Sequence, residues 1–185
     1  MIIRDAMEDD FQAIAAIYND VLLTSTAIYA DDPATVDERI AWWKARTRQN
    51  YPTLVACDGG SVIGFSSFGD FRAWPGYRFT VEHTVHVDAA WRGKGAGSAL
   101  LRALIPRAAA LGKHMMIGGI DAQNVASLRL HERLGFERVA HFKEVGFKFG
   151  RFLDLVFVQL PIGGGYVTPP AARTKTARRW RWETG

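Results

Sequence analysis

The sequence contains a single cysteine, Cys57, among its 185 residues. One cysteine excludes an internal disulfide and a metal site built from several thiolates. Because Cys57 follows the apolar residues TLVA, we expect a buried thiol with a structural role. Long apolar runs are also missing: no stretch approaches the roughly 20 residues that span a bilayer, and the first ten residues are too acidic for a secretory signal. We therefore expect a cytoplasmic protein without a membrane partner.

Excess charge is missing from most of the chain as well. The formal net charge is +4, and residues 162–185 account for all of it, with Arg173, Lys175, Arg178, Arg179 and Arg181 against Glu183. A neutral body argues against a nucleic-acid-binding face on the folded domain. We expect one domain over residues 1–161 and a basic, disordered and solvated tail over 162–185, in preference to a tail that binds RNA, membrane or acidic protein.

Hydrophobic spacing and turn residues predict strands alternating with helices. A T-x-x-E capping box at Thr35 and Glu38 begins one helix, Asn124 can cap another, and Asp58-Gly59-Gly60 forms a hairpin turn. The expected strands are 2–4, 53–57, 61–69, 77–87, 115–120, 137–147 and 152–160, and the expected helices cover 11–22, the residues after 35, 100–111 and 125–134. The strands before residue 88 therefore form an antiparallel meander.

The segment from Val81 to Leu101, VEHTVHVDAAWRGKGAGSALL, carries the strongest functional signal. It predicts a strand, a glycine-rich turn and the start of a helix. Glycines 93, 95 and 97 leave the turn without side-chain bulk, so that backbone N–H groups can converge on one anion at the positive end of the helix. We expect this turn to hold a pyrophosphate. A carboxylate, Glu82, lies on the strand that leads into it.

Two common phosphate-binding motifs do not match the turn. The P-loop requires G-x-x-x-x-G-K-[ST], and no glycine stands five residues before a Gly-Lys pair followed by Ser or Thr. The dinucleotide fingerprint requires G-x-G-x-x-G, but after Gly93 and Gly95 its third position falls on Ser98. Asp121 at the end of the next expected strand is the one feature that favours a nicotinamide site, and the antiparallel meander weighs against it.

The turn does match R-x-x-G-x-G, from Arg92 to Gly97, and is followed by Asn124, Ser127 and the segment LHERLGF at residues 130–136. In these motifs the chain resembles the GCN5-related N-acetyltransferase (GNAT) superfamily. The segments YPTLVA, FGDFR, YRFTVEHTVHV and VGFKFGRFLDLVFVQL resemble its phosphinothricin and methionine sulfoximine acetyltransferase branch, from residue 3 to about 160. The resemblance implies an α/β (α+β) fold. Its central sheet is twisted, mixed and mostly antiparallel, with flanking helices and splayed strands at the acetyl-CoA site.

The reaction implied by the resemblance is transfer of the acetyl group of acetyl-CoA to an amine. Glu82 is the expected base that accepts the amine proton, directly or through water, whereas its structural alternative is an ion-paired strand residue. His131 is the expected acid for the departing thiolate, at a position where many superfamily members have tyrosine. Its alternative is a structural helix histidine. We expect His83 to serve packing or hydrogen bonding, and we expect the same of the His86 side chain.

The resemblance also implies a set of acetyl-CoA contacts and no metal. The backbone of one strand should pair with the pantetheine arm, the glycine turn should bind pyrophosphate with two nearby cations, and the helix after residue 124 should reach the other side of CoA. These residues are Val85, His86 and Val87; Arg92, Gly93, Lys94, Gly95, Ala96, Gly97 and Ser98; and Asn124 and Arg133. Plain helix capping is the alternative role for Asn124.

The acceptor implied by the branch is a small toxic amino-acid analogue: methionine sulfoximine, methionine sulfone or phosphinothricin. Its acidic groups need fixed donors, which Arg72 and Arg78 can supply on either side of the turn formed by Trp74, Pro75, Gly76 and Tyr77. We also consider Tyr29 and Phe71 as lining residues. The segment 143–148 is expected to reach the site across a homodimer, as the resemblance suggests.

Two other functions stay open at this point. The acceptor can instead be another amine, such as a polyamine or a peptide N-terminus, and a wide acidic cleft would favour the polyamine. A non-catalytic acyl-CoA sensing module that uses the basic tail belongs to a different class. The presence of both Glu82 and His131 argues against that module.

Overall fold

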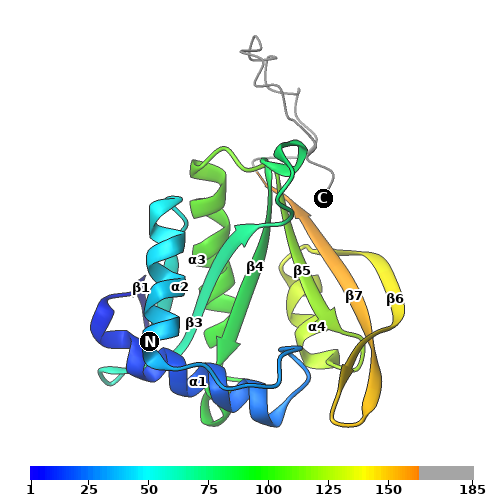
Figure 1. Cartoon of the computed structure of the whole chain (residues 1–185). Coiled ribbons are helices and arrows are strands. Elements are labelled where there is room, and N and C mark those ends of the chain that lie inside the picture. Colours follow the sequence, from blue (N-terminus) through cyan, green and yellow to red (C-terminus); the bar gives the residue numbers. More distant parts are fainter. Residues whose placement is uncertain (163–185) are drawn as a thin grey trace, which may run out of the picture.

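Seven strands form one sheet in the computed structural model, which describes residues 1–162 (Figure 1). Their order across the sheet is β1-β2-β3-β4-β5-β7-β6, and only β4 and β5 pair in parallel. The strands are β1 (Ile2–Asp5), β2 (Thr53–Asp58), β3 (Ser61–Asp70), β4 (Thr80–Val87), β5 (Met115–Asp121), β6 (Glu137–Lys148) and β7 (Arg151–Pro161). The mixed, mostly antiparallel sheet predicted from the sequence is confirmed.

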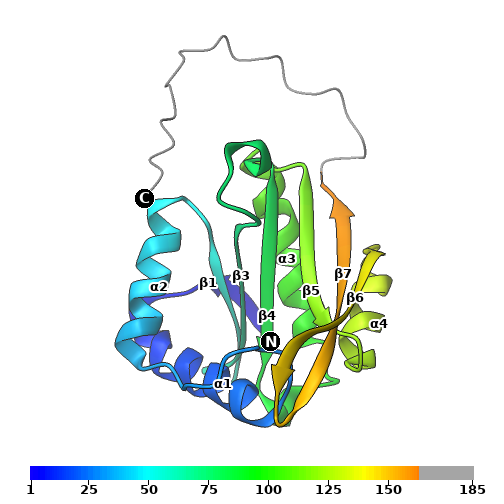
Figure 2. The same cartoon turned by 45° about the vertical axis from the view of Figure 1, so that its right-hand side comes forward.

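Four helices cover the two faces of this sheet (Figures 1 and 2). Helices α1 (Phe11–Thr24) and α2 (Val36–Arg48) lie on one face, and α3 (Ala96–Ala110) and α4 (Val125–Arg133) lie on the other. The predicted caps are present: Thr35 and Glu38 form a capping box, and the Asn124 side chain accepts from the N–H of Ser127. Short 3-10 helices precede α1 (Glu8–Asp10), β4 (Pro75–Tyr77) and the glycine turn (Ala89–Trp91).

The alternation of strand side chains divides the core into two layers. Phe11 of α1 packs with Val55 and Phe65 on one face, whereas Leu100 of α3 packs with Val81 on the other. Full burial of such a side chain contributes roughly 1.5–3 kcal/mol. The alternation also sorts the residues of β4, so that Glu82 and His86 face α1 and α2, while His83 and Val85 face α3 and α4.

Strands β4 and β5 separate soon after they meet. Within residues 1–162 they pair only at Thr80–Met115, Val81–Met116 and Glu82–Ile117, and beyond this point they diverge in Figure 1. The other edge of β4 stays paired with β3 as far as Val87. The backbone from His83 to Val87 is therefore open on the β5 side, which is the splayed geometry expected for a strand that receives a ligand.

Three local expectations differ from the structure. β4 begins at Thr80 rather than at residue 77, because Pro75 starts a 3-10 turn and cannot donate to a strand ladder. Cys57 is only partly buried. Ile162, assigned to the tail, is buried and donates its N–H to the His114 carbonyl at 2.7 Å. The rest of the expected tail, 163–185, lies outside the described residues.

Candidate active site

A cleft of about 70 Å³ opens where β4 and β5 separate. It is lined by Ala27, His83, Thr84, Val85, His86, Gly119, Ile120, Asp121, Asn124, Ser127 and His131. Four residues predicted from the sequence are among them: Val85, His86, Asn124 and His131. Val87 ends β4 and leads into the glycine turn, so that one continuous segment joins the cleft to the predicted pyrophosphate site.

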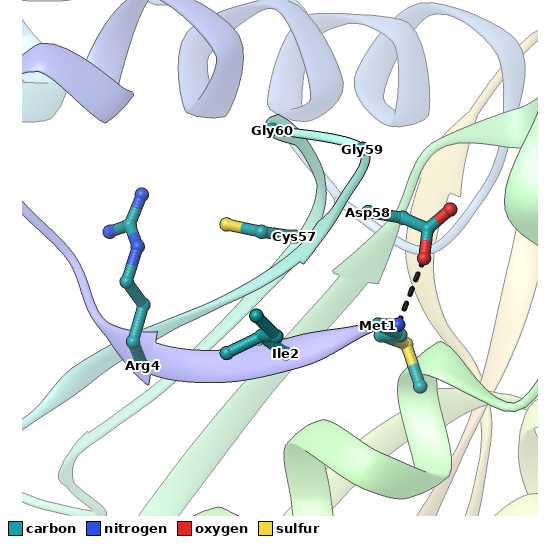
Figure 3. Close-up of a pocket in the computed structure, with 7 residues that line it drawn as sticks. All are labelled: Met1, Ile2, Arg4, Cys57, Asp58, Gly59 and Gly60. Atoms are coloured by element: carbon teal, nitrogen blue, oxygen red, sulfur yellow. Dashed lines mark ion pairs between the residues drawn. The ribbon is translucent and has the colours of Figure 1, made fainter.

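A larger hollow of about 290 Å³ lies elsewhere, at the β1–β2 edge of the sheet (Figure 3). It is lined by Met1, Ile2, Arg4, Cys57, Asp58, Gly59 and Gly60. Its charged groups have internal partners: the Met1 amine lies 2.9 Å from the Asp58 carboxylate, and Arg4 is paired with Asp10. No residue predicted for catalysis or cofactor binding lines this hollow, so its size does not make it the active site.

The glycine turn has the backbone conformation that the sequence pattern required. Gly93 and Gly95 have φ values of 76° and 90°, in a region that side-chain-bearing residues rarely adopt. Gly97 is small for another reason, since a Cβ there would lie 3.3 Å from the Leu130 side chain. The first bond within α3 runs from Ala99 N–H to Gly95 C=O, which leaves the N–H groups of residues 96–98 without intrahelical acceptors. This helix terminus is suited to bind an anion.

The two cationic side chains of the turn, Arg92 and Lys94, contact other groups of the protein. Arg92 donates from Nε to the Val87 carbonyl at 3.1 Å and from Nη2 to Asp20 on α1 at 3.3 Å. The Lys94 Nζ lies 4.8 Å from the centre of the Trp91 ring. Both side chains are exposed, as is Arg133 near the end of α4. Arg92 thus ties the turn to α1 while its positive charge stays beside the turn.

Glu82 lies half-buried on the face opposite His131 and next to Gly119, which lines the cleft. A Cβ on Gly119 would stand 3.3 Å from the Glu82 carboxylate oxygen, so the glycine leaves that oxygen room. Burial raises the pKa of Glu82, and the positive charge of Arg72 lowers it to a smaller extent. A carboxylate with a raised pKa beside a ligand cleft is suited to accept a proton.

His131 is almost completely buried, at 1% exposure, and both of its ring nitrogens have neighbours. Nδ1 lies 2.7 Å from the Ser127 carbonyl oxygen, and Nε2 lies 3.2 Å from Nε2 of His83. Burial lowers the pKa of His131, so its neutral form is favoured. The structure thus brings His131 to the cleft and pairs it with His83, a residue for which the sequence suggested packing or hydrogen bonding.

The neutral histidines of β4 predict a loss of stability in acid. Burial lowers the pKa of His83 to about 3 and that of His86 to about 4, whereas an unfolded histidine titrates near 6.5. Below pH 6.5 the unfolded chain binds protons that the folded chain refuses, so stability falls as the pH falls toward these values. The slope is about 1.4 kcal/mol per pH unit for each such histidine. Urea unfolding at pH 7 and pH 5 measures it.

A matched pair of variants tests the source of this slope. His83→Phe should reduce the difference between pH 7 and pH 5, whereas His141→Gln, which alters a half-exposed histidine paired with Asp154, should not. Equal pH dependence in His83→Phe and the parent protein would contradict the assignment.

The two predicted acceptor-binding arginines take different positions. The Arg72 guanidinium lies 4.1 Å from the centre of the Phe71 ring, and its charge acts on Glu82. Arg78 instead donates to the Pro75 carbonyl at 3.0 Å and packs over Phe79. Arg72 also donates to the Phe71 carbonyl at 2.7 Å, so both arginines bind carbonyls of their own loop, and only the charge of Arg72 acts on Glu82. The turn residues Trp74, Pro75, Gly76 and Tyr77 are exposed beside them.

An aromatic chain lies beside Glu82, and the sequence analysis missed two of its members, Phe142 and Phe157. Phe71 contacts Tyr77 and Phe157, with ring centres 5.8 and 6.0 Å apart, and Phe157 continues to Phe142 at 5.7 Å. Phe157 also lies 3.3 Å from the position of a Cβ on Gly119, as Glu82 does. Phe157 lies between Val156 and Val158 in an apolar run of β7, so its local sequence resembles that of a core strand.

The segment between α1 and α2 lies against the cleft, which its residue Ala27 lines. Thr26 donates to the buried carboxylate of Asp121, and Lys148 donates to the Ile28 carbonyl at 2.7 Å. The ring of Tyr29 lies against Gly146, where no Cβ would fit. Residues 143–148 therefore contact the α1–α2 segment of their own chain, and their contribution across a dimer stays a prediction.

Two further properties bear on cofactors and location. Among residues 1–162, no three or more His, Cys, Asp or Glu side chains are grouped so that they could bind a metal ion. No helix in the same range is both long and apolar enough to cross a bilayer.

Comparison with known proteins identifies the relatives of this fold and sequence. Residues 12–136 match the model of the acetyltransferase (GNAT) family. An L-methionine sulfoximine/L-methionine sulfone acetyltransferase from Salmonella typhimurium is 49% identical over 88% of this chain and 95% of its own. A solved Salmonella typhimurium acetyltransferase with acetyl-CoA is 47% identical and superposes with a TM-score of 0.89, covering 92% and 98% of the two chains. A Sinorhizobium meliloti phosphinothricin acetyltransferase solved with acetyl-CoA is 39% identical, with a TM-score of 0.89 and 92% coverage of both chains.

Proposed function

The chain belongs to the acetyltransferase (GNAT) family, and on this premise we propose that it acetylates the amino group of a small amino-acid analogue. It is an acetyl-CoA-dependent N-acetyltransferase. The acceptors we propose are methionine sulfoximine, methionine sulfone and phosphinothricin. The chain is 49% identical to a methionine sulfoximine/sulfone acetyltransferase over 95% of that protein's length, which supports this acceptor class. Such an activity would detoxify the analogue, because the acetylated nitrogen no longer acts as a free amine.

The observation that carries the proposal is that β4 connects a ligand cleft, a helix N-terminus and a carboxylate. The open backbone of β4 can hydrogen-bond a pantetheine arm, the α3 N-terminus can bind pyrophosphate, and Glu82 adjoins the cleft through Gly119. The cofactor-binding residues proposed are those of β4 at 85–87 and of the turn at 92–98, together with Asn124 and Arg133. Val85, His86 and Asn124 line the cleft, which supports this assignment.

In the proposed reaction, Glu82 accepts a proton from the acceptor amine, directly or through water. The freed lone pair of the nitrogen attacks the acetyl carbonyl carbon, a C–N bond forms, and the nitrogen loses its second proton to His131. The C–S bond then breaks with its electron pair on sulfur. His131 supplies the proton that converts the thiolate to a thiol. Arg72 is placed to bind an acidic group of the acceptor, and the Phe71–Phe157 pair is placed to pack against its side chain.

A thiol-release assay with acetyl-CoA tests the proposed function. The panel contains methionine sulfoximine, methionine sulfone, phosphinothricin, unmodified amino acids, a polyamine and a peptide with a free N-terminus. Saturable release with the analogues is the expected result. Preferential release with the polyamine or peptide would replace the acceptor class, and no release with any amine would favour an acyl-CoA sensing protein.

We also propose a cytoplasmic homodimer, with the β6–β7 hairpin in the interface. Six apolar side chains of the hairpin are about half exposed or more: Val139, Phe142, Val145, Phe147, Phe149 and Phe152. A single protein rarely exposes so many neighbouring apolar groups without a partner. The dependence on acetyl-CoA and the single cysteine support the cytoplasmic location.

Charge introduced on this hairpin should therefore separate the two subunits. Phe147→Glu combined with Phe152→Glu is expected to halve the mass measured by light scattering after size-exclusion chromatography, because buried charges without partners oppose association. Ile2→Glu, at a residue 69% exposed on the opposite edge of the sheet, is the control and should leave the mass unchanged. A parent protein that is already monomeric would refute the dimer.

A further inference from the structure

The two nitrogens of His131 cannot both be free to exchange protons with a substrate. Nδ1 lies 2.7 Å from the Ser127 carbonyl, which can only accept, so the Nδ1 atom must carry hydrogen and donate it. Nε2 is then the one nitrogen of His131 that can gain or lose a proton. Its neighbour at 3.2 Å is Nε2 of His83.

This contact fixes the proton positions of both rings. In the neutral pair, Nε2 of His131 carries a lone pair and accepts a hydrogen bond. His83 must therefore carry hydrogen on its own Nε2 and donate it. The remaining nitrogen, His83 Nδ1, is then an acceptor, and it is buried without a hydrogen-bond partner within residues 1–162. A buried acceptor without a partner costs free energy, and within the described residues it is the one ring nitrogen of the pair that has no hydrogen-bond neighbour.

The protein keeps the two rings together by leaving space beside them. A Cβ on Gly118 of β5 would lie 2.6 Å from Nε2 of His83, so any larger residue would displace that nitrogen. The rings are nearly parallel, at 16°, with centres 5.0 Å apart, and Phe136 contacts both from the side. Apolar packing thus holds the nitrogens in contact.

We propose that His83 is a positioning residue of the acetyltransferase reaction, which holds Nε2 of His131 and shares one proton with it. This inference rests on the proposed function, in which His131 protonates the thiolate. When the C–N bond has formed, the pair gains the second proton that the nitrogen loses. His131 then carries hydrogen on both nitrogens and donates to Ser127 and to His83, whose own hydrogen is now on Nδ1. After the C–S bond breaks, the Nε2 proton of His131 passes to the thiolate sulfur. His83 exchanges its Nδ1 hydrogen for one on Nε2 through solvent, and the pair returns to its starting neutral form.

The surroundings of the pair fit a temporary proton carrier. From β4 the charge of His86 acts on His83, and from β5 the carboxylate of Asp121 lines the same cleft, as does Ser127 of α4. Burial disfavours a lasting positive charge on either ring. A pair that is neutral at rest can therefore take up a proton during turnover and release it again.

Nuclear magnetic resonance of the histidine side chains tests the pair without any enzyme assay. With ¹⁵N-labelled histidine, the expected result is hydrogen on Nδ1 of His131 and on Nε2 of His83, and a scalar coupling between the two Nε2 nitrogens across the hydrogen bond. Gly118→Ala retains both imidazoles and should abolish that coupling, while the signals of His141 on β6 stay unchanged. A parent protein without the coupling, or with hydrogen on Nε2 of His131, would overturn the proposal.

Kinetics then distinguish positioning from general structural support. His83→Phe should lower kcat by roughly 10- to 100-fold with an unchanged KM for acetyl-CoA, as expected when a hydrogen-bond partner of an essential group is lost. His83→Gln should recover part of kcat, since the amide oxygen can accept from His131. Equal kcat in His83→Phe and parent, or equal losses in both variants, would refute the role.

Failure of the proposed function would look different. If the parent protein released no thiol with any amine, the activity would be lost while the coupling between His83 and His131 persisted. A folded His83→Phe protein, judged by circular dichroism, is required for the kinetic comparison. Gly118→Ala supplies the same comparison with both histidines present, and an unchanged kcat in a variant that lacks the coupling would also refute the proposal.

Discussion

Replacing Glu82 with glutamine is expected to lower kcat for acetylation by about 10²- to 10⁴-fold, the usual contribution of a general base. Glutamine keeps the size and the hydrogen-bonding capacity of the side chain but cannot take the amine proton at neutral pH. The Kd for acetyl-CoA should stay within about twofold, because Glu82 is still paired with Ile117 of β5 and lies outside the open backbone of β4. Stopped-flow thiol release and calorimetric binding measure the two quantities.

The pH profile adds a test of the environment of Glu82. The base must be ionised, so kcat/KM should fall as the pH falls through the pKa of Glu82, which burial raises above its ordinary value. Arg72→Gln removes a charge that lowers this pKa, and the fall should then begin at a higher pH. Arg72→Lys keeps the charge and should preserve the profile. Glu137→Gln, at an exposed residue of β6, controls for loss of a carboxylate, and equal turnover in Glu82→Gln and this control would refute the base.

Replacing Gly95 with valine is expected to raise the Kd for acetyl-CoA by roughly 5- to 150-fold. Space is not the cause, because a Cβ at Gly95 would meet no atom within 4 Å. The cause is the φ of 90°, which costs a β-branched residue about 1–3 kcal/mol. The free turn can relax from this conformation, and its N–H groups then no longer converge. Binding has to restore the strained conformation, so the cost is paid in affinity.

The chain offers a close control for Gly95→Val. Gly60 has a φ of 86° and equally open surroundings, but it lies in the β2–β3 hairpin. Gly60→Val should therefore impose similar backbone strain while the Kd for acetyl-CoA stays at the parent value. Calorimetry with both variants makes the comparison, and an equal Kd in Gly95→Val and Gly60→Val would refute the pyrophosphate assignment.

The elements of the fold follow closely from local sequence signals. Periodicity located the strands and helices, and the capping residues Thr35 and Asn124 marked two helix starts where the structure has them. Prediction was weaker at the start of β4, because aromatic and β-branched residues around 77–80 favour a strand while Pro75 favours a turn. The 3-10 turn that formed there moves the strand start to Thr80.

The candidate site was predictable only where one short segment carries the geometry. The glycine turn is such a segment, because the need for positive φ is a local property of Gly93 and Gly95. The contact between His83 and His131 joins residues 48 positions apart, and nothing in either local pattern indicates it. For the same reason, Arg72 and Arg78 were equivalent in sequence, and only the tertiary structure places the charge of Arg72, and not that of Arg78, where it acts on Glu82.

The short seam between β4 and β5 divides the sheet into a half built on β1–β4 and a half built on β5–β7. Within the sheet three residue pairs join the halves, and side-chain contacts such as Thr26–Asp121 and Phe71–Phe157 also connect the two sides. In the proposed binding mode acetyl-CoA spans this seam, so its binding should couple the unfolding of the two halves, adding about 2.7 kcal/mol at a concentration 100 times Kd. In a cell, the lifetime of the protein against proteases would then follow the supply of acetyl-CoA, and starvation for the co-substrate would lower the amount of enzyme as well as its rate.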